Sequence, residues 1–378
     1  MILFDQLAQR VEKEWSASGG QLDSFTDIAT QALSELEYDL SLEDLNQQIQ
    51  EWLLKSSALP QQISIHNTFG QPSLTVFNNG RFVVDIYIWV DFDTSIHSHG
   101  FRGAFRVLHG QSLQENFTVQ TEKKLAEDIS LVDMSDIQHE RLVAGDVRAI
   151  APGSDLTHRV IHLENPTITL CVKTINEPAL KQWTYLQTGL AVQKQNANPD
   201  IAKKVYSFQY LLSQNEASAA QFLSDFLGQL DISSQIHLYE DAASGAYGIS
   251  SETIERIVER IVSLHEGSEW WARYEAFHLI RMNELYSEGS NKPIERLVAH
   301  FINSGYKLKQ IEPLLKKFSS EPIAEVVKDL MDIPAIFNFD LADEDREEIK
   351  GLIAAPKKVV PEHLKQFRQI QLMRDFIL

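Results

Sequence analysis

The sequence predicts a multidomain α+β protein in which a central β-barrel is flanked by all-α regions. The spacing of apolar residues along the chain supports this fold class in three segments. It is helical at the start of the chain, changes to two near Leu59 and Pro60, and becomes helical again after Pro178. We therefore expect an N-terminal helical region over residues 1–58, a β-barrel over residues 59–178 and a C-terminal helical domain over residues 179–378.

The N-terminal region carries three helical stripes. Leu3, Leu7 and Val11 are four residues apart, which places them on one face of a helix. A second stripe lies within residues 25–36, and a third, within residues 45–54, follows a segment at 41–44 that resembles a capping box. A small helical bundle that packs on the following segment is the expected result.

The central region alternates apolar and polar residues in short runs. Residues 82–90 are the clearest example, and Asn78, Asn79 and Gly80 form a tight-turn signal ahead of them. Many short strands joined by Gly and Pro turns are typical of a jelly-roll barrel.

After Pro178 the stripes are helical, with breaks at Gly267, Gly289 and Pro322 but no repeat of fixed period. The aromatic stripe at 270–277 fits a helix core better than an aromatic cage. No motif in this region indicates a function.

Composition excludes two classes of partner. The chain has 378 residues, and its 53 acidic against 34 basic side chains give a net charge of −19. This charge argues against binding to nucleic acid and against docking on anionic lipid. The single cysteine, Cys171, lies in an apolar run and fits a buried thiol in a reducing compartment. Neither a signal peptide nor an apolar segment of about 18 residues is present, so we expect a cytoplasmic protein.

Three histidines carry the strongest functional signal. His97 and His99 are two residues apart in a β-forming segment, so their side chains point to the same face of a strand. His158 follows a Pro-Gly turn and opens a second candidate strand. Neutral imidazole is a common ligand of iron, zinc and copper. A lone His-x-His pair also occurs on surface strands, and it is the third histidine that favours a metal site.

Two motifs resemble those of the cupin superfamily. The first is the pair His97 and His99, followed by Gly110. The second combines a glycine, a Pro-Gly turn, a histidine and an asparagine: Gly145, Pro152, Gly153, His158 and Asn165. The surrounding residues resemble the cysteine dioxygenase branch at 81–89, 95–99, 104–110, 157–160 and 164–172.

The resemblance covers about residues 75–175. It implies that the barrel is a double-stranded β-helix, the cupin jelly roll. It also implies that His97, His99 and His158 hold ferrous iron without a carboxylate ligand.

The chain departs from that branch at several positions. The glutamate ligand of most cupins falls near Ala104, which cannot bind metal. Thr169, Cys171 and Lys173 stand where the branch has a serine, a histidine and a tyrosine. The arginine that grips a substrate carboxylate has no counterpart in residues 56–80. Free cysteine is therefore not the expected substrate.

Five further residues are candidates for roles beside the metal. Lys173 and Tyr87 are candidate catalytic residues, although the strand face of Tyr87 equally suits core packing. Arg102 and Arg106 are candidate substrate-binding residues, since a guanidinium fork suits a carboxylate, although exposed arginines are commonly just solvated. His162, four residues after His158, is a candidate for a side chain that hydrogen-bonds near the metal site.

The expected function is that of a non-haem iron(II)-dependent oxygenase that oxidises a small thiol or related small acid with O2. The alternative is a metal-binding cupin without turnover that acts as a sensor or assembly platform through its helical regions. One divalent metal is expected, with Fe(II) favoured and zinc, nickel or copper also able to occupy three histidines. The expected partners are a small-molecule substrate and O2, with no nucleic acid or membrane, and the oligomeric state is open.

Overall fold

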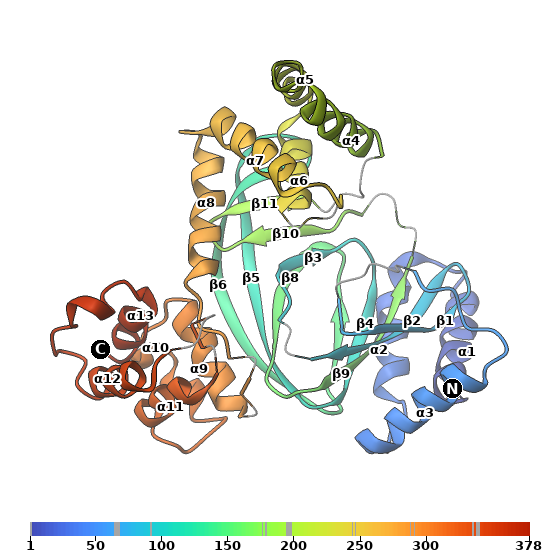
Figure 1. The fold of residues 1–378 in the computed structure, drawn as a ribbon. Helices are drawn as coiled ribbons and strands as arrows, with labels where there is room; N and C mark the ends of the chain where they lie inside the picture. Colours follow the sequence, from blue (N-terminus) through green and yellow to red (C-terminus); the bar gives the residue numbers. More distant parts are fainter. Residues whose placement is uncertain are drawn as a thin grey trace. The chain divides into compact units, whose positions relative to one another are not determined.

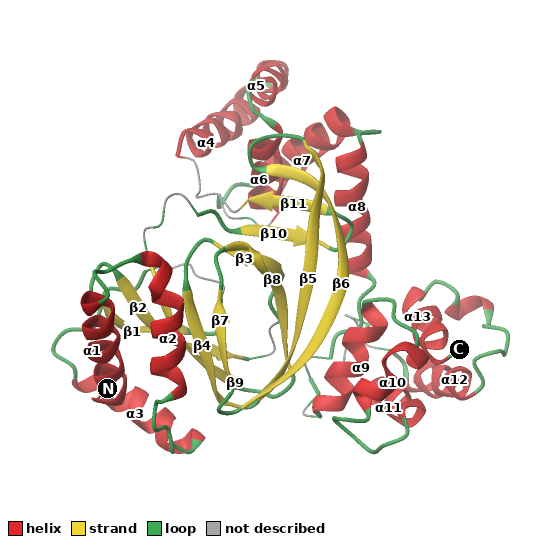
Figure 2. Cartoon of the chain, turned by 180° about the vertical axis from the view of Figure 1, so that it is seen from behind, coloured by secondary structure: helices red, strands yellow, loops and turns green. Residues whose placement is uncertain are grey.

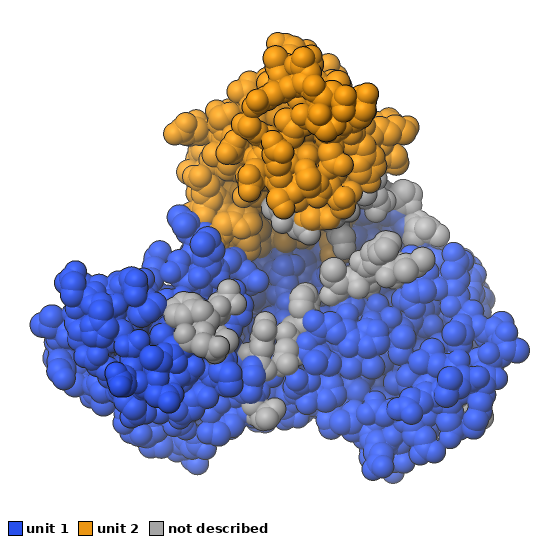
Figure 3. Space-filling model, viewed as in Figure 1, with its two compact units in different colours: residues 1–117, 136–180, 279–378 blue, residues 118–135, 181–278 orange. Residues whose placement is uncertain are grey.

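A computed structural model describes residues 2–63, 69–90, 93–175, 177, 180–193, 199–243, 245, 247–287, 289–290, 292–334, 336–337 and 341–378. It is a mixed structure in which helices flank β-sheets (Figures 1 and 2). The chain divides into two compact units (Figure 3). The first contains residues 1–117, 136–180 and 279–378, and the second contains residues 118–135 and 181–278.

The N-terminal helices form as predicted. They are α1 (Ile2–Ala17), α2 (Phe25–Ser34) and α3 (Leu42–Lys55), with a short 3-10 helix at Leu22–Ser24. The side chain of Ser41 accepts a hydrogen bond from the backbone N–H of Asp44, which caps α3. The apolar faces of these helices bury Phe4, Phe25 and Leu33 against strand residues such as Val84 and Leu170.

The strands form two sheets. The first has the order β1-β2-β9-β4-β7 and the second has the order β10-β11-β6-β5-β8-β3. Their bounds are β1 (Ser73–Asn78), β2 (Phe82–Trp89), β3 (Ile96–His99), β4 (Gly103–His109), β5 (Gln111–Lys124), β6 (Ile129–Val143), β7 (Val147–Ile150), β8 (Gly153–His162), β9 (Thr167–Thr174), β10 (Trp183–Leu186) and β11 (Leu190–Gln193).

The predicted start of the C-terminal helices is wrong. Residues 183–193 form the hairpin β10–β11, and β11 pairs with β6 through Leu190 and Leu131. Strands of four residues are too short to show a clear apolar period, so the sequence pattern did not reveal them.

Beyond residue 200, all regular structure in the described part of the chain is helical, as predicted. The helices are α4 (Pro199–Gln214), α5 (Glu216–Gly228), α6 (Ile232–Ala243), α7 (Ser251–His265), α8 (Glu269–Met282), α9 (Pro293–Asn303), α10 (Leu308–Leu315), α11 (Ile323–Asp329), α12 (Asp343–Ala354) and α13 (Arg368–Ile377), with 3-10 turns at Leu330–Asp332 and Glu362–Leu364. Trp270, Trp271 and Tyr274 of α8 are buried in the core of the second unit, in agreement with the core interpretation of the aromatic stripe. No described helix is long and apolar enough to cross a membrane.

The last hundred residues do not fold apart from the barrel. Leu113 of β5 and Ile161 of β8 share one apolar core with α9 residues such as Leu297 and Phe301. The compact units therefore differ from the three consecutive segments expected from sequence. The reason is that β5 and β6 continue into the second unit, while α9 to α13 belong to the first.

Candidate metal centre

The structure brings His97, His99 and His158 together. β3 and β8 are antiparallel neighbours, and His97 lies directly opposite His158. One ring nitrogen from each residue lies within 4.8 Å of the other two, and all three side chains are buried. The ring centroids are separated by 4.8 to 5.0 Å. Two strand positions on one face, and a third across the ladder, therefore point at one common place.

The environment disfavours protonation of two of these rings. Burial lowers the pKa of His99 and of His158 well below the ordinary value, and the neighbouring His97 lowers both further. The Nδ1 atom of His97 lies 2.8 Å from the carbonyl oxygen of Ser95. Because a carbonyl only accepts, Nδ1 carries the proton and Nε2 keeps the lone pair that a metal uses.

The donor set fits a divalent metal. Nδ1 of His99 and Nδ1 of His158 are buried without a hydrogen-bond partner among the described residues. Buried polar atoms are normally paired, so an unpaired set of imidazole nitrogens indicates a missing partner. A cation shared by neutral imidazoles supplies such a partner. Protonation of all three rings would instead place like charges close together in a buried site.

The residues near the position where most cupins carry a glutamate ligand are apolar. Ala104 is fully buried on the sheet face that packs against the N-terminal helices. Its neighbour Phe105 points to the other face, where it packs with Tyr87, Trp89 and Cys171. Neither alanine nor phenylalanine can bind a metal, and among the described residues the group at this place consists of the three histidines.

Lys173 and Tyr87 meet on that inner face. The ammonium nitrogen of Lys173 donates to the Tyr87 hydroxyl at 2.5 Å and lies 2.8 Å from Oδ2 of Asp85. The Tyr87 hydroxyl lies 3.1 Å from the same Oδ2, and Thr75 donates to Oδ1 of Asp85 at 2.7 Å. The Lys173 and Asp85 side chains are 13% and 5% exposed, so this is a buried ion pair.

The ion pair fixes the protonation of its members. Burial opposes the charge of Lys173, but Tyr87 and Asp85 outweigh burial and raise its pKa above the ordinary value. Burial raises the pKa of Tyr87, which therefore stays a neutral phenol. Since Asp85 balances Lys173, the pair offers hydrogen bonds without net positive charge.

Aromatic contacts connect the ion pair to the histidines. The Lys173 ammonium lies 5.2 Å from the centroid of the Phe101 ring, and Phe101 packs edge-to-face on His99 at 5.0 Å. The charge of Lys173 is also one of the causes that lower the pKa of His99. The lysine is therefore a neighbour of the three histidines rather than a remote core residue.

The two arginines are not available as a substrate clamp, which corrects the sequence prediction. Arg106 donates from Nη1 to the carbonyl oxygens of Leu33 at 2.8 Å and Leu36 at 2.6 Å, at the end of α2. Carbonyl oxygens at the C-terminal end of a helix favour a nearby cation. Arg102 forms an ion pair with the buried Glu177 and lies 3.3 Å from Asp23.

In the described part of the chain, His162 packs with Trp89 and Ser112 rather than with the three histidines, which differs from the sequence prediction. Four residues along a strand separate its Cα from that of His158 by about 13 Å. Its ring stacks on Trp89 with centroids 4.3 Å apart, and its Nδ1 lies 3.0 Å from the hydroxyl of Ser112. Burial lowers the pKa of His162 to about 3, so this ring is a neutral core residue.

Sequence reasoning missed the partner of Lys173. Asp85 is an acidic residue inside an otherwise apolar strand, and that exception was the available signal. Asp85 lies opposite Cys171 in the β2–β9 ladder, and Lys173 lies opposite Val83, so the pair is formed diagonally. The register of two strands nearly ninety residues apart is not visible in a single sequence.

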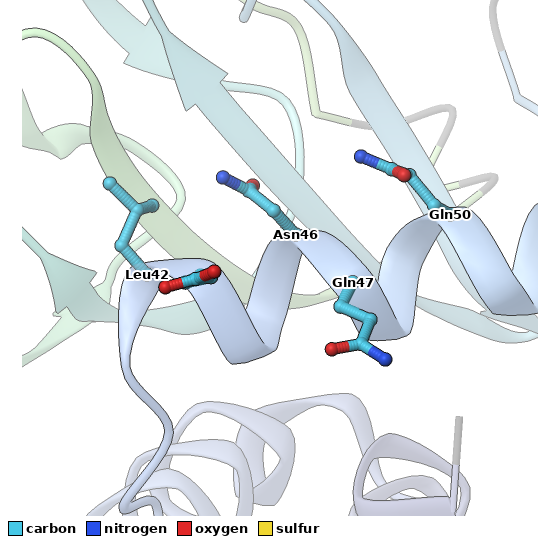
Figure 4. Close-up of a pocket in the computed structure, with 5 residues that line it drawn as sticks. Leu42, Asn46, Gln47 and Gln50 are labelled. Atoms are coloured by element: carbon cyan, nitrogen blue, oxygen red, sulfur yellow. The ribbon is translucent and has the colours of Figure 1, made fainter.

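Two other features of the surface carry no functional assignment. Asp345, Glu348 and His363 lie together, but His363 contacts both carboxylates as an ordinary exposed ion pair. A pocket on α3 is lined by Leu42, Glu43, Asn46, Gln47 and Gln50 (Figure 4). Its amide side chains are open to solvent, and none of the three histidines contributes to it.

No family model and no curated protein matches this chain. Solved structures that resemble it include hydroquinone 1,2-dioxygenase from a Sphingomonas species, with 12% identity, 29% of this chain and 68% of that chain covered, and a TM-score of 0.22. A cupin superfamily protein from Desulfitobacterium hafniense has 14% identity, covers 31% and 95% of the two chains, and has a TM-score of 0.20. A cupin sugar phosphate isomerase from Silicibacter pomeroyi has 14% identity, covers 34% and 80%, and has a TM-score of 0.22.

Cupin superfamily proteins are among the solved structures that share this partial likeness, which covers about a third of the chain. The functional argument below rests on the geometry of the three histidines.

Proposed function

We propose that His97, His99 and His158 bind one divalent metal ion, Fe(II) in the cell, and that the chain is a non-haem iron-dependent cupin oxygenase. The observation that carries this proposal is the convergence of three buried ligand atoms within 4.8 Å of one another. The strand order and the antiparallel pairing support a double-stranded β-helix as the fold of the barrel.

Bound Fe(II) would supply the electrons that activate dioxygen. The protein's own groups would hold the ligands and the nearby protons in place. The Ser95 carbonyl fixes the tautomer and the ring orientation of His97. Tyr87 keeps its proton on the phenol oxygen, where Lys173 donates and Asp85 accepts, so the three form a fixed polar group beside the site.

The proposed substrate is a small thiol rather than a thiol-free acid, and free cysteine is not the preferred one. A buried carboxylate needs a cation that is not already paired, because its desolvation otherwise costs several kcal/mol. Asp85 already compensates Lys173, and Arg102 and Arg106 bind elsewhere. A substrate that presents a hydroxyl or thiol to Lys173 and Tyr87 fits this wall better than one that presents a free amino acid.

The experiment is oxygen uptake by protein reconstituted with Fe(II) without air. The panel compares cysteine with thioglycolate, 3-mercaptopropionate, 2-mercaptoethanol and acetate. We expect uptake that requires a thiol, is lost in His99→Ala, and is lower with cysteine than with at least one shorter or uncharged thiol. Cysteine turnover as efficient as that of every other thiol would refute the substrate part of the proposal.

The same experiment separates the alternative function. The helices that pack on the barrel through Leu113 and Ile161 favour a metal-binding protein that serves as a sensor or assembly platform. That function predicts bound Fe(II) with no thiol-dependent oxygen uptake by the wild-type protein.

A further inference from the structure

A buried carboxylate lies behind the metal ligand His158. In the β5–β8 ladder, Asn116 is opposite His158 and Glu115 is opposite Arg159. Because neighbouring residues point to opposite faces, Glu115 and Arg159 lie on the other face of the same ladder from His158. The first unit places α9 against that outer face.

Three basic side chains from three elements converge on Glu115, which is fully buried. Arg159 donates from Nε to Oε2, across the ladder. His139 of β6 places Nε2 at 2.9 Å from Oε1, and His300 of α9 places Nε2 at 3.2 Å from the same oxygen. One carboxylate therefore joins β5, β6, β8 and α9.

Arg159 is fixed from both sides. Besides Glu115, it donates from Nη2 to the hydroxyl of Ser304 at 3.0 Å. Ser304 is the residue at the C-cap of α9, one turn after His300. The arginine that directly follows a metal ligand is thus held by the barrel and by the end of the same helix.

Electrostatics makes this cluster costly to disturb. Burial alone would raise the pKa of Glu115, but the charges of His300 and Arg159 outweigh burial and hold it well below the ordinary value. The carboxylate is therefore ionised at neutral pH. Removing its charge would leave the half-buried Arg159 beside a neutral group, and such an unpaired charge drives local rearrangement.

We propose that Glu115 is a positioning residue through which α9 sets the orientation of β8, and thereby of His158, in the metal site. Rotation of β8 about its axis would move Arg159 and His158 together, since they are consecutive residues on opposite faces. The contacts of Arg159 with Glu115 and Ser304 oppose that rotation. This inference rests on the proposed metal function, and it connects the C-terminal end of α9 to the metal centre.

The test is a titration with Co(II), whose visible absorption reports both affinity and ligand geometry. We expect Glu115→Gln, which keeps the side-chain volume, to weaken Co(II) binding by about tenfold, as is typical for loss of an outer partner of a metal ligand. We also expect its d–d bands to shift in position or intensity. His300→Gln, which leaves Arg159 paired, should change both readouts in the same direction but less.

The matched control is Met373→Ala in α13. Met373 is fully buried in the same apolar core but belongs to another helix, and its truncation leaves a cavity that destabilises the fold. We expect this variant to lose stability while its Co(II) affinity and spectrum stay as in the wild type. A loss of Co(II) affinity in Glu115→Gln but not in Met373→Ala would indicate a positioning role. General destabilisation would lower the Co(II) affinity of both variants.

Three results would overturn the inference. Unchanged Co(II) affinity and spectrum in Glu115→Gln and His300→Gln would overturn this inference but leave the proposed metal site intact. An equal loss of affinity in Met373→Ala would assign the effect to stability. Wild-type protein that binds no Co(II) would overturn the proposed function, and the inference that rests on it.

Discussion

Replacing Lys173 by Met tests the buried ion pair beside the metal site. The substitution keeps a long side chain but leaves the Asp85 carboxylate, 5% exposed, without its cation. Removing one partner of a buried pair typically costs about 3–5 kcal/mol of folding free energy. Thr75 and Tyr87 still contact Asp85, so we expect the lower end, about 3 kcal/mol.

The assay is urea unfolding at pH 7 with circular dichroism. Lys350→Met is the matched control, since Lys350 pairs at the surface with Asp332, whose side chain is 65% exposed, and such pairs contribute about 1 kcal/mol or less. The double variant Lys173→Met/Asp85→Asn removes both charges, so it should be more stable than Lys173→Met alone. If Lys173→Met costs no more than Lys350→Met, the assignment of a buried, structurally required pair is refuted.

Three further predictions follow from packing and burial. In the unfolded chain His162 becomes protonated below about pH 6.5. In the folded protein its pKa is about 3, so it stays neutral until the pH approaches that value. Stability should therefore fall as pH drops through this window, and His162→Phe should reduce the loss measured by urea unfolding at pH 7 and pH 5. Gly103→Ala should disrupt the β4–β9 ladder and lower the melting temperature, since the new Cβ would lie 2.1 Å from the backbone oxygen of Val172. Gly351→Ala is the matched control: its Cβ would meet no atom within 4 Å, and alanine should stabilise α12 by about 0.5–1 kcal/mol in the same thermal melts. Cys171, buried with its pKa raised to about 12, should react with a thiol reagent only after unfolding, and fast labelling of native protein would contradict this.

Residues governed by local periodicity were predictable from the sequence. The alternation of His97 and His99 follows from local backbone geometry, whereas His158 joins them across the β3–β8 ladder and was expected there because of the resemblance to the cupin motifs. The stripes that begin at Leu3 and Phe25 predicted helices for the same reason.

Features that depend on pairing between distant segments were not predictable. Arg106 looks like a substrate ligand in sequence, but the end of α2 lies against it in space. Lys173 looks like an unpaired cation until the β2–β9 register brings Asp85 beside it. The ties between Glu115 and α9 join residues that are nearly two hundred positions apart in sequence, and no local pattern carries that information.

The most direct test of the central claim is the metal content of each chain after anaerobic reconstitution with Fe(II) and removal of free metal. The wild-type protein should retain one ion per chain, as should His109→Ala, whose histidine lies outside the three-histidine group. His97→Ala, His99→Ala and His158→Ala should each lose it while keeping the circular dichroism spectrum of the wild type. Retention of a full equivalent by folded His158→Ala, or no retention by the wild type, would contradict a metal site made of these three histidines.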